Sequence, residues 1–251
     1  MMILQYYLLA SIIFASNLAQ GQAIAALDWI QDRILCPLFE ICHQEPAHLT
    51  CTTSNCVALK FIEFGIVPDV LQKAPPEMLK VQYGSKEVQL GNNMTVAETT
   101  YMPTVLSWTT EPNMLYTLMF SDPDAPSDQD ASARSARHWL VTNIPGIDIA
   151  RGNTIRPYFG PGPPAGSGFH RYNFLVYKQN GRITATDATD GYNGPDKVRT
   201  CQLIDEAFPN DPMRAARLKD NLHWSPERFA AKNGLGELVA GNFFRCQFDG
   251  I

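Results

Sequence analysis

The chain has 251 residues, of which 45% are hydrophobic, so it can bury one large core. Its formal net charge of −5 argues against a nucleic-acid partner, because binding along a phosphate backbone needs clustered lysine and arginine. The same weak acidity is compatible with a pocket that holds a single phosphate group.

The chain begins with an apolar segment. Residues 1–21 carry no charged side chain and end in Ala19-Gln20-Gly21, whose small residues suit a signal-peptide cleavage site. An uncleaved membrane anchor is the alternative, but the apolar run is shorter than the roughly 20 residues of a membrane span and contains Gln5, Ser11 and Ser16. We therefore expect residues 1–21 to be a signal peptide, and the mature protein to be secreted without a transmembrane anchor.

Residues 22–56 form a cysteine-rich segment. A segment this short needs disulfides to stay ordered, and a secreted chain folds where disulfides persist. We expect an arm that packs on the main domain; a separate interaction module is the alternative. The simplest disulfide pattern has two bridges among the first four cysteines, in any of three pairings, and one bridge between the last two. The six cysteines are Cys36, Cys42, Cys51, Cys56, Cys201 and Cys246.

The remaining residues, 57–251, contain short alternating runs separated by turn residues. Such runs are typical of an antiparallel β-sandwich or barrel, so we expect a mostly β domain with few helices. The predicted strands are residues 78–83, 86–90, 104–108, 115–120, 138–143, 172–178 and 238–244. The predicted helices are residues 57–64, 211–218 and 225–232, the last with Ser225 as its N-cap.

A glycosylation sequon, Asn93-Met94-Thr95, lies between two predicted strands. A sequon of this kind fits an exposed loop in a secreted protein. We therefore expect a glycan on Asn93.

Three segments place polar residues beside predicted core strands. Asp122 and Asp124 flank a proline directly after one strand, and His138 opens the next strand. Residues 158–172 are rich in glycine and proline and end in His170-Arg171-Tyr172. Glycines let backbone N–H groups approach an anion, and prolines reduce the entropy lost on binding. Each segment alone is more often structural, as acidic proline turns usually are.

Together these segments resemble the phosphatidylethanolamine-binding protein family, also called Raf kinase inhibitor proteins. The matching motifs are residues 122–127, 138–146 and 160–178, in that order. The resemblance implies two antiparallel sheets with peripheral helices, and a small pocket for phosphate, acetate or a phosphoethanolamine head group. It also suggests a cis peptide bond between Asp122 and Pro123. The ligand-binding residues that the resemblance implies are Asp122, Asp124, His138, Gly162, Pro164, His170 and Tyr172.

The chain departs from the family pattern at three places. Residues 134–137 read Arg-Ser-Ala-Arg where many animal members have an Arg-Glu-Trp-like run, so an aromatic pocket wall is lost at Ala136. Phe244 falls where many members have a pocket tyrosine. The chain ends at Ile251 without the helix that covers the pocket in mammalian members, so we expect an open mouth.

Two carboxylates beside an anion require a cation near them. We expect Asp122 to orient His138 or His170 as that cation, while Asp124 faces the amine of a zwitterionic head group. A neutral aspartic acid, with its pKa raised by burial, is the alternative.

The sequence therefore predicts a secreted binding or regulatory protein with a pocket for phosphate-type anions or phospholipid head groups. Inhibition of an enzyme is one function that such a protein could have. We expect no enzymatic activity, because Ser121, Ser127 and Ser167 lack a nucleophile-elbow motif such as GxSxG. We expect no cofactor and no metal. The alternatives are a hydrolase that uses the aspartates and histidines, and an interaction factor that binds an unknown protein partner through the cysteine-rich arm.

Overall fold

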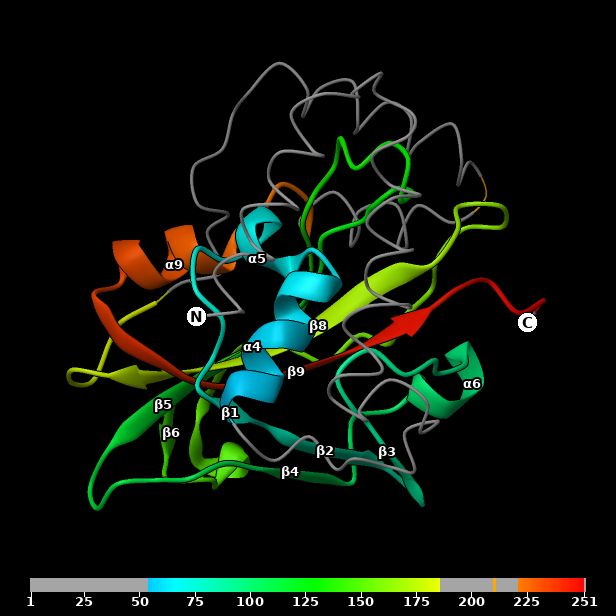
Figure 1. The fold of residues 1–251 in the computed structure, drawn as a ribbon. Helices are drawn as coiled ribbons and strands as arrows, with labels where there is room; N and C mark the ends of the chain where they lie inside the picture. Colours follow the sequence, from blue (N-terminus) through cyan, green and yellow to red (C-terminus); the bar gives the residue numbers. More distant parts are fainter. Residues whose placement is uncertain (1–53, 186–209, 211–220, 251) are drawn as a thin grey trace, which may run out of the picture. The chain divides into compact units, whose positions relative to one another are not determined.

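The structure, a computed structural model, describes residues 54–185, 210 and 221–250 (Figure 1). These residues all belong to one compact unit formed by residues 51–251. The predicted signal peptide, the cysteine-rich arm up to residue 53 and the predicted helix 211–218 lie outside the described residues. Helix α4 (Ser54–Glu63) begins three residues before the predicted start of the main domain at residue 57.

The large sheet has six strands in the order β1-β9-β8-β5-β6-β7. Its neighbouring strands are antiparallel except for the parallel pair β1–β9. The strands are β1 (Glu77–Met78), β5 (Leu115–Asp122), β6 (Ala136–Pro145), β7 (Asn153–Arg156), β8 (His170–Gln179) and β9 (Leu235–Cys246).

The small sheet has three antiparallel strands in the order β3-β2-β4. They are β2 (Lys80–Tyr83), β3 (Lys86–Glu87) and β4 (Val105–Ser107). The prediction of a mostly β fold with two sheets and few helices is confirmed.

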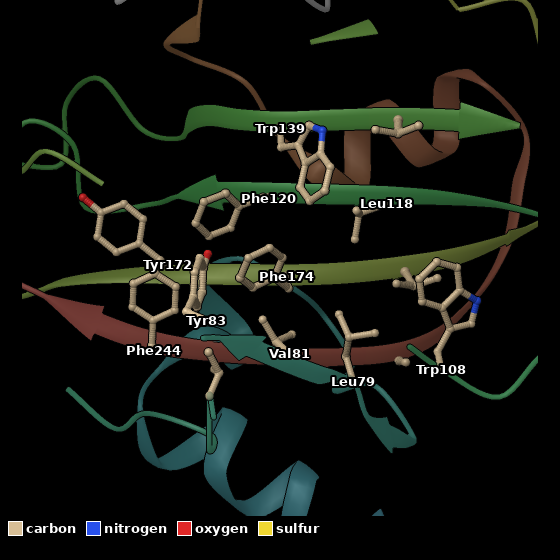
Figure 2. Close-up of a cluster of buried hydrophobic side chains, with 14 of the residues drawn as sticks. Leu79, Val81, Tyr83, Trp108, Leu118, Phe120, Trp139, Tyr172, Phe174 and Phe244 are labelled. Carbon is tan, nitrogen blue, oxygen red and sulfur yellow. The ribbon is translucent and has the colours of Figure 1, made fainter. Parts of the chain in front are cut away.

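The large sheet is buried on both faces, which explains why β5, β6 and β8 read as nearly continuous apolar runs. Because side chains alternate along a strand, Phe120 and Phe174 face the small sheet, whereas Met119 and Leu175 face the helices. The rings of Phe120 and Phe174 stack with centroids 4.1 Å apart. Figure 2 shows Tyr172 and Phe244 at one end of this core and Trp108 at the other.

Helices cover the second face of the large sheet. Phe61 of α4 and Phe229 of α9 (Pro226–Lys232) pack in the same core cluster as Phe243 of β9, and Figure 1 shows α4 running across β8 and β9. The predicted N-cap of α9 is confirmed, because the Ser225 side chain accepts a hydrogen bond from the backbone N–H of Arg228. Within the described ranges, no helix is long and apolar enough to cross a membrane.

Short elements were not predicted. These are α5 (Ile66–Asp69), α6 (Val96–Thr99), the 3-10 helix η2 (Ile149–Arg151), β1 and β7. Asn93 of the sequon is exposed directly before α6, and its glycosylation stays a prediction.

Two predictions of local covalent geometry are wrong. Cys246 is a free thiol, buried in the core cluster at the end of β9, so the predicted bridge to Cys201 is absent. Cys56 is disulfide-bonded, while the other four cysteines lie outside the described residues. The Asp122–Pro123 bond is trans. The cis bonds in the described chain are Val67–Pro68, Ala125–Pro126 and Arg134–Ser135.

Candidate functional site

Four of the predicted ligand-binding side chains meet at one end of the large sheet. Asp122 ends β5, His138 lies in β6, and His170 and Tyr172 open β8, so three adjacent strands supply them. The ring of Tyr172 lies 5.3 Å from that of His138 and 6.3 Å from that of His170, measured between centroids. All four residues are at least nine-tenths buried. The sequence motifs therefore converge as predicted.

A β-bulge places His138 in this group. Phe120 of β5 pairs with Trp139 of β6, but the next residue, Ser121, pairs with Arg137, so His138 is an extra residue in the ladder. A bulge redirects a side chain that regular pairing would otherwise fix. The His138 ring consequently lies 5.5 Å from that of Phe120 and 5.6 Å from that of Phe159, beside Tyr172.

His170 is held between two oxygen atoms. Its Nδ1 lies 2.8 Å from Oδ2 of Asp122, and its Nε2 lies 3.0 Å from Oγ of Ser167. Ser167 donates its hydroxyl hydrogen to the carbonyl of Pro164 at 2.7 Å, which leaves its oxygen free to accept from Nε2. Burial alone would lower the pKa of His170, but the hydrogen bond and charge of Asp122 outweigh burial and raise it. The hydrogen bond with Asp122 therefore favours the protonated form of His170, and the prediction that His170 is the cation beside a bound anion stays a prediction.

His138 behaves in the opposite way. Burial lowers the pKa of His138, and the charge of Asp122 and the carbonyl of Phe159 offset this only in part. Its Nδ1 donates a hydrogen bond to that carbonyl at 2.8 Å. The backbone of Gly160 also interacts with the ring, and within the described part of the chain no side chain hydrogen-bonds Nε2.

Tyr172 contributes a buried hydroxyl. Burial, followed by the charge of Asp122, raises the pKa of Tyr172 well above its usual value, while the backbone N–H of Gly162 works against that rise. The ring stacks on Phe244 at 5.3 Å, so the phenylalanine at the family's tyrosine position supports Tyr172 by packing.

Asp124 does not face the ligand group as predicted. The side chain of Arg171 binds both of its oxygens, with Nε 2.9 Å from Oδ2 and Nη2 2.6 Å from Oδ1. The same arginine also donates to Asp69 Oδ2 at 2.8 Å and to the carbonyl of Phe64 at 3.0 Å. Because side chains alternate along β8, Arg171 points to the face opposite His170 and Tyr172. The proposed contact between Asp124 and a ligand amine is replaced by this ion pair.

The glycine- and proline-rich loop lies at the edge of the group. Gly162 and Pro164 are exposed, and the carbonyl of Pro164 is occupied by the backbone and side chain of Ser167. Gly168 has φ +80°, and a Cβ there would meet Asp128 at 2.3 Å, so only glycine fits. Ser167 was not singled out as a site residue, although its position three residues before His170 could have indicated this contact.

No three His, Cys, Asp or Glu side chains among residues 54–185, 210 and 221–250 are arranged to hold a metal ion. The site is therefore described by its hydrogen bonds and charges alone.

Comparison with known sequences identifies the family. The sequence profile described as "Phosphatidylethanolamine-binding protein" matches residues 84–244, which is more than half of the chain. The chain belongs to the phosphatidylethanolamine-binding protein family. The "Putative odorant-binding protein A5" of Drosophila melanogaster is 31% identical over 188 residues, which cover 74% of this chain and 78% of that protein.

A second relative in the family is the "26 kDa secreted antigen" of Toxocara canis. It is 35% identical over 193 residues, which cover 76% of this chain but only 64% of the antigen. This chain therefore spans less than two thirds of that relative's length.

Solved structures show the same fold. The carboxypeptidase Y inhibitor, solved in complex with its cognate proteinase, superposes with a TM-score of 0.60 at 23% identity, over 80% of this chain and 98% of that chain. The phosphatidylethanolamine-binding protein from Plasmodium vivax gives a TM-score of 0.56 at 22% identity, over 77% and 98%.

Ala136 replaces the aromatic residue that many animal members of the phosphatidylethanolamine-binding protein family carry near the pocket. Its side chain is buried in a small cluster with Ala125, Ala133 and Leu222.

Proposed function

We propose that this chain is a secreted, non-enzymatic binding protein whose site at Asp122, His138, His170 and Tyr172 accepts a phosphate-type anion or a phospholipid head group. The observation that carries the proposal is that no side chain of the described residues hydrogen-bonds Nε2 of His138, in a buried group that already contains the ion pair His170–Asp122. The exposed backbone of Gly162 and Pro164 at the edge of the group supports an opening to solvent.

The two histidines have different tasks in this proposal. Both ring nitrogens of His170 are occupied by protein atoms, so His170 acts through its charge rather than by direct contact. His138 is neutral in the free protein because burial lowers its pKa. An anion beside Nε2 favours the protonated ring, so His138 takes up a proton when the anion binds.

Proton uptake makes the affinity dependent on pH. We expect phosphate, phosphoethanolamine and acetate to bind more tightly as the pH falls from 7.5 to 5.5. If the protonation of His138 is the only proton uptake linked to anion binding, the affinity rises by up to about tenfold per pH unit. Isothermal titration in two buffers of different ionisation enthalpy measures the proton uptake directly. Comparison of phosphate with phosphoethanolamine shows whether an amine adds affinity.

Variants assign the binding to this site. His138→Asn and Asp122→Asn are expected to remove most of the anion affinity, while Asp148→Asn, at an exposed position beyond the far end of β6, leaves it unchanged. Anion binding that is equal in all three variants, or that is accompanied by no proton uptake, would contradict the proposal.

Two features of relatives support the wider proposal. A relative named as a secreted antigen supports secretion, and mass spectrometry of the medium, with the N-terminus mapped, tests it. The likeness to the carboxypeptidase Y inhibitor makes protease inhibition the second candidate function. A titration of carboxypeptidase activity with this chain tests inhibition, and activity that is unchanged at a molar excess of the chain would reject it.

A further inference from the structure

A hydroxyl, an imidazole and a carboxylate form a continuous chain of hydrogen bonds in the site. Ser167 Oγ lies 3.0 Å from His170 Nε2, and His170 Nδ1 lies 2.8 Å from Asp122 Oδ2. Ser167 is 7% exposed, His170 1% and Asp122 3%. A nucleophile next to a base that is itself oriented by a third group is the arrangement that activates serine in covalent chemistry.

We propose that Ser167 is an activated nucleophile that takes an acyl or phosphonyl group from a small ester, with His170 as its base and Asp122 as the orienting group. This inference goes beyond the proposed binding function and replaces its non-enzymatic part. It shares His170 and Asp122 with the anion site, but it requires neither His138 nor a bound anion.

The protonation of His170 sets the direction of the Ser167 hydroxyl. With His170 protonated, Nε2–H donates to Ser167, and the serine hydroxyl donates to the Pro164 carbonyl at 2.7 Å. Once His170 is neutral, Nε2 becomes an acceptor, and the hydroxyl hydrogen can turn from Pro164 to Nε2. The nucleophile is therefore active only in the neutral state of His170.

The backbone after Ser167 supplies a donor for a developing oxyanion. The N–H of Gly168, the residue that follows the serine, makes no hydrogen bond within the described part of the chain. In other nucleophilic serine sites, the N–H of the following residue stabilises the oxyanion. The carboxylate of Asp128 lies against Gly168 and opposes negative charge there. We therefore expect a slow reaction, which Asp128→Asn accelerates.

The reaction balances without a cofactor. Ser167 Oγ forms a bond to the carbonyl carbon of the ester, and its proton passes to His170 Nε2. The C–O bond to the leaving alcohol then breaks, the alcohol departs with that proton, and the acyl group stays on Ser167. With diisopropyl fluorophosphate, the Oγ–P bond forms, the P–F bond breaks, fluoride leaves and the proton remains on His170. The burial of Ser167 restricts the reaction to small esters.

The test is covalent labelling of the full chain with diisopropyl fluorophosphate at pH 8.5, followed by intact-mass analysis and peptide mapping. We expect one adduct per chain, located on Ser167. Ser127→Ala serves as the matched control, because Ser127 lies in the acidic loop, where its Oγ accepts from Asp130, and it is expected to label like the wild type. Asp122→Asn is expected to slow labelling at least about 100-fold, the usual scale for loss of an oriented base.

The pH profile separates an activated serine from one that is merely accessible. The labelling rate is expected to rise as His170 loses its proton, above the ordinary histidine range, because its pKa is raised. The titratable groups that act on His170 through their charge or lie beside it are Asp122, Asp124, Asp128, His138, Tyr172 and Cys246.

Three results would overturn the inference: no adduct on Ser167, an adduct that forms equally fast in urea-unfolded protein, or a rate that Asp122→Asn leaves unchanged. Phosphate binding by the wild-type chain is measured in parallel. Intact phosphate binding without an adduct on Ser167 rejects the nucleophile and leaves the proposed binding function standing.

Discussion

His138 and His170 stand side by side in the same site, yet their environments shift their pKa values in opposite directions. His170 gains a carboxylate partner, whereas His138 is buried against carbonyl groups and rings. The sequence could name both histidines because their motifs are distinctive. It could not assign their roles, because the bulge at His138 and the hydrogen bond of His170 to Ser167 depend on strand register.

The opposite shifts predict a stability maximum near pH 6.5, the ordinary pKa of histidine. Below that pH, the unfolded chain binds a proton at His138 more readily than the folded protein does, so stability rises with pH. Above it, the folded protein holds the His170 proton more tightly than the unfolded chain, so stability falls as the pH rises through the folded pKa of His170. Urea unfolding from pH 5 to 8.5 measures this curve.

Single variants separate the two limbs of the curve. His138→Asn is expected to flatten the acid limb, and His170→Asn is expected to flatten the alkaline limb. A curve whose two limbs persist in both variants would show that other groups govern the pH dependence.

At the scale of elements, Arg171 joins parts of the chain that are far apart in sequence. It connects the carboxyl end of α4, through the Phe64 carbonyl, and α5, through Asp69, to Asp124 in the turn after β5. Strands of six or more buried residues could be predicted from their apolar runs, as β5 and β8 were. The two-residue β1 and the four-residue α5 and α6 carry too little periodicity, and the partner of Asp124 is fixed only by packing.

We expect Arg171→Gln to lower the free energy of unfolding by about 3 kcal/mol, because it leaves the buried carboxylate of Asp124 without its cation. Asp124→Asn is expected to have a similar effect, and the double variant is expected to cost clearly less than the sum of the two single variants. Urea unfolding of the four proteins gives the coupling energy.

Lys178→Gln provides the matched control on the same strand. Lys178 forms an ion pair with the exposed Glu111, so its loss should leave the unfolding midpoint unchanged. Effects of Arg171→Gln and Asp124→Asn that simply add would mean that the pair is not coupled.

At the scale of the whole molecule, one sheet serves two cores. Phe174 lies in the cluster under the small sheet and Leu175 in the cluster under the helices, and both belong to the central strand β8. The two-sheet arrangement followed from the family resemblance, and the strands followed from the sequence. The sequence predicts that successive residues of a strand point to opposite faces of the sheet. Only the structure shows that both faces are covered, so that these residues lie in two different cores.

The shared sheet predicts that the two cores unfold together. Phe174→Ala is expected to lower the free energy of unfolding by about 3–5 kcal/mol and Leu175→Ala by about 2–5 kcal/mol. Near-UV circular dichroism follows the aromatic core and far-UV circular dichroism follows the backbone. The two signals should change at the same midpoint in each variant, whereas separate midpoints would show that the two faces are independent.

The bulge in β6 gives that strand one residue more than its ladder with β5 can pair. A chain without His138 would therefore pair β5 and β6 without interruption at this position. The same chain would lose the imidazole whose Nε2 is the proposed ligand contact, so the irregular pairing and the proposed binding site depend on the same residue.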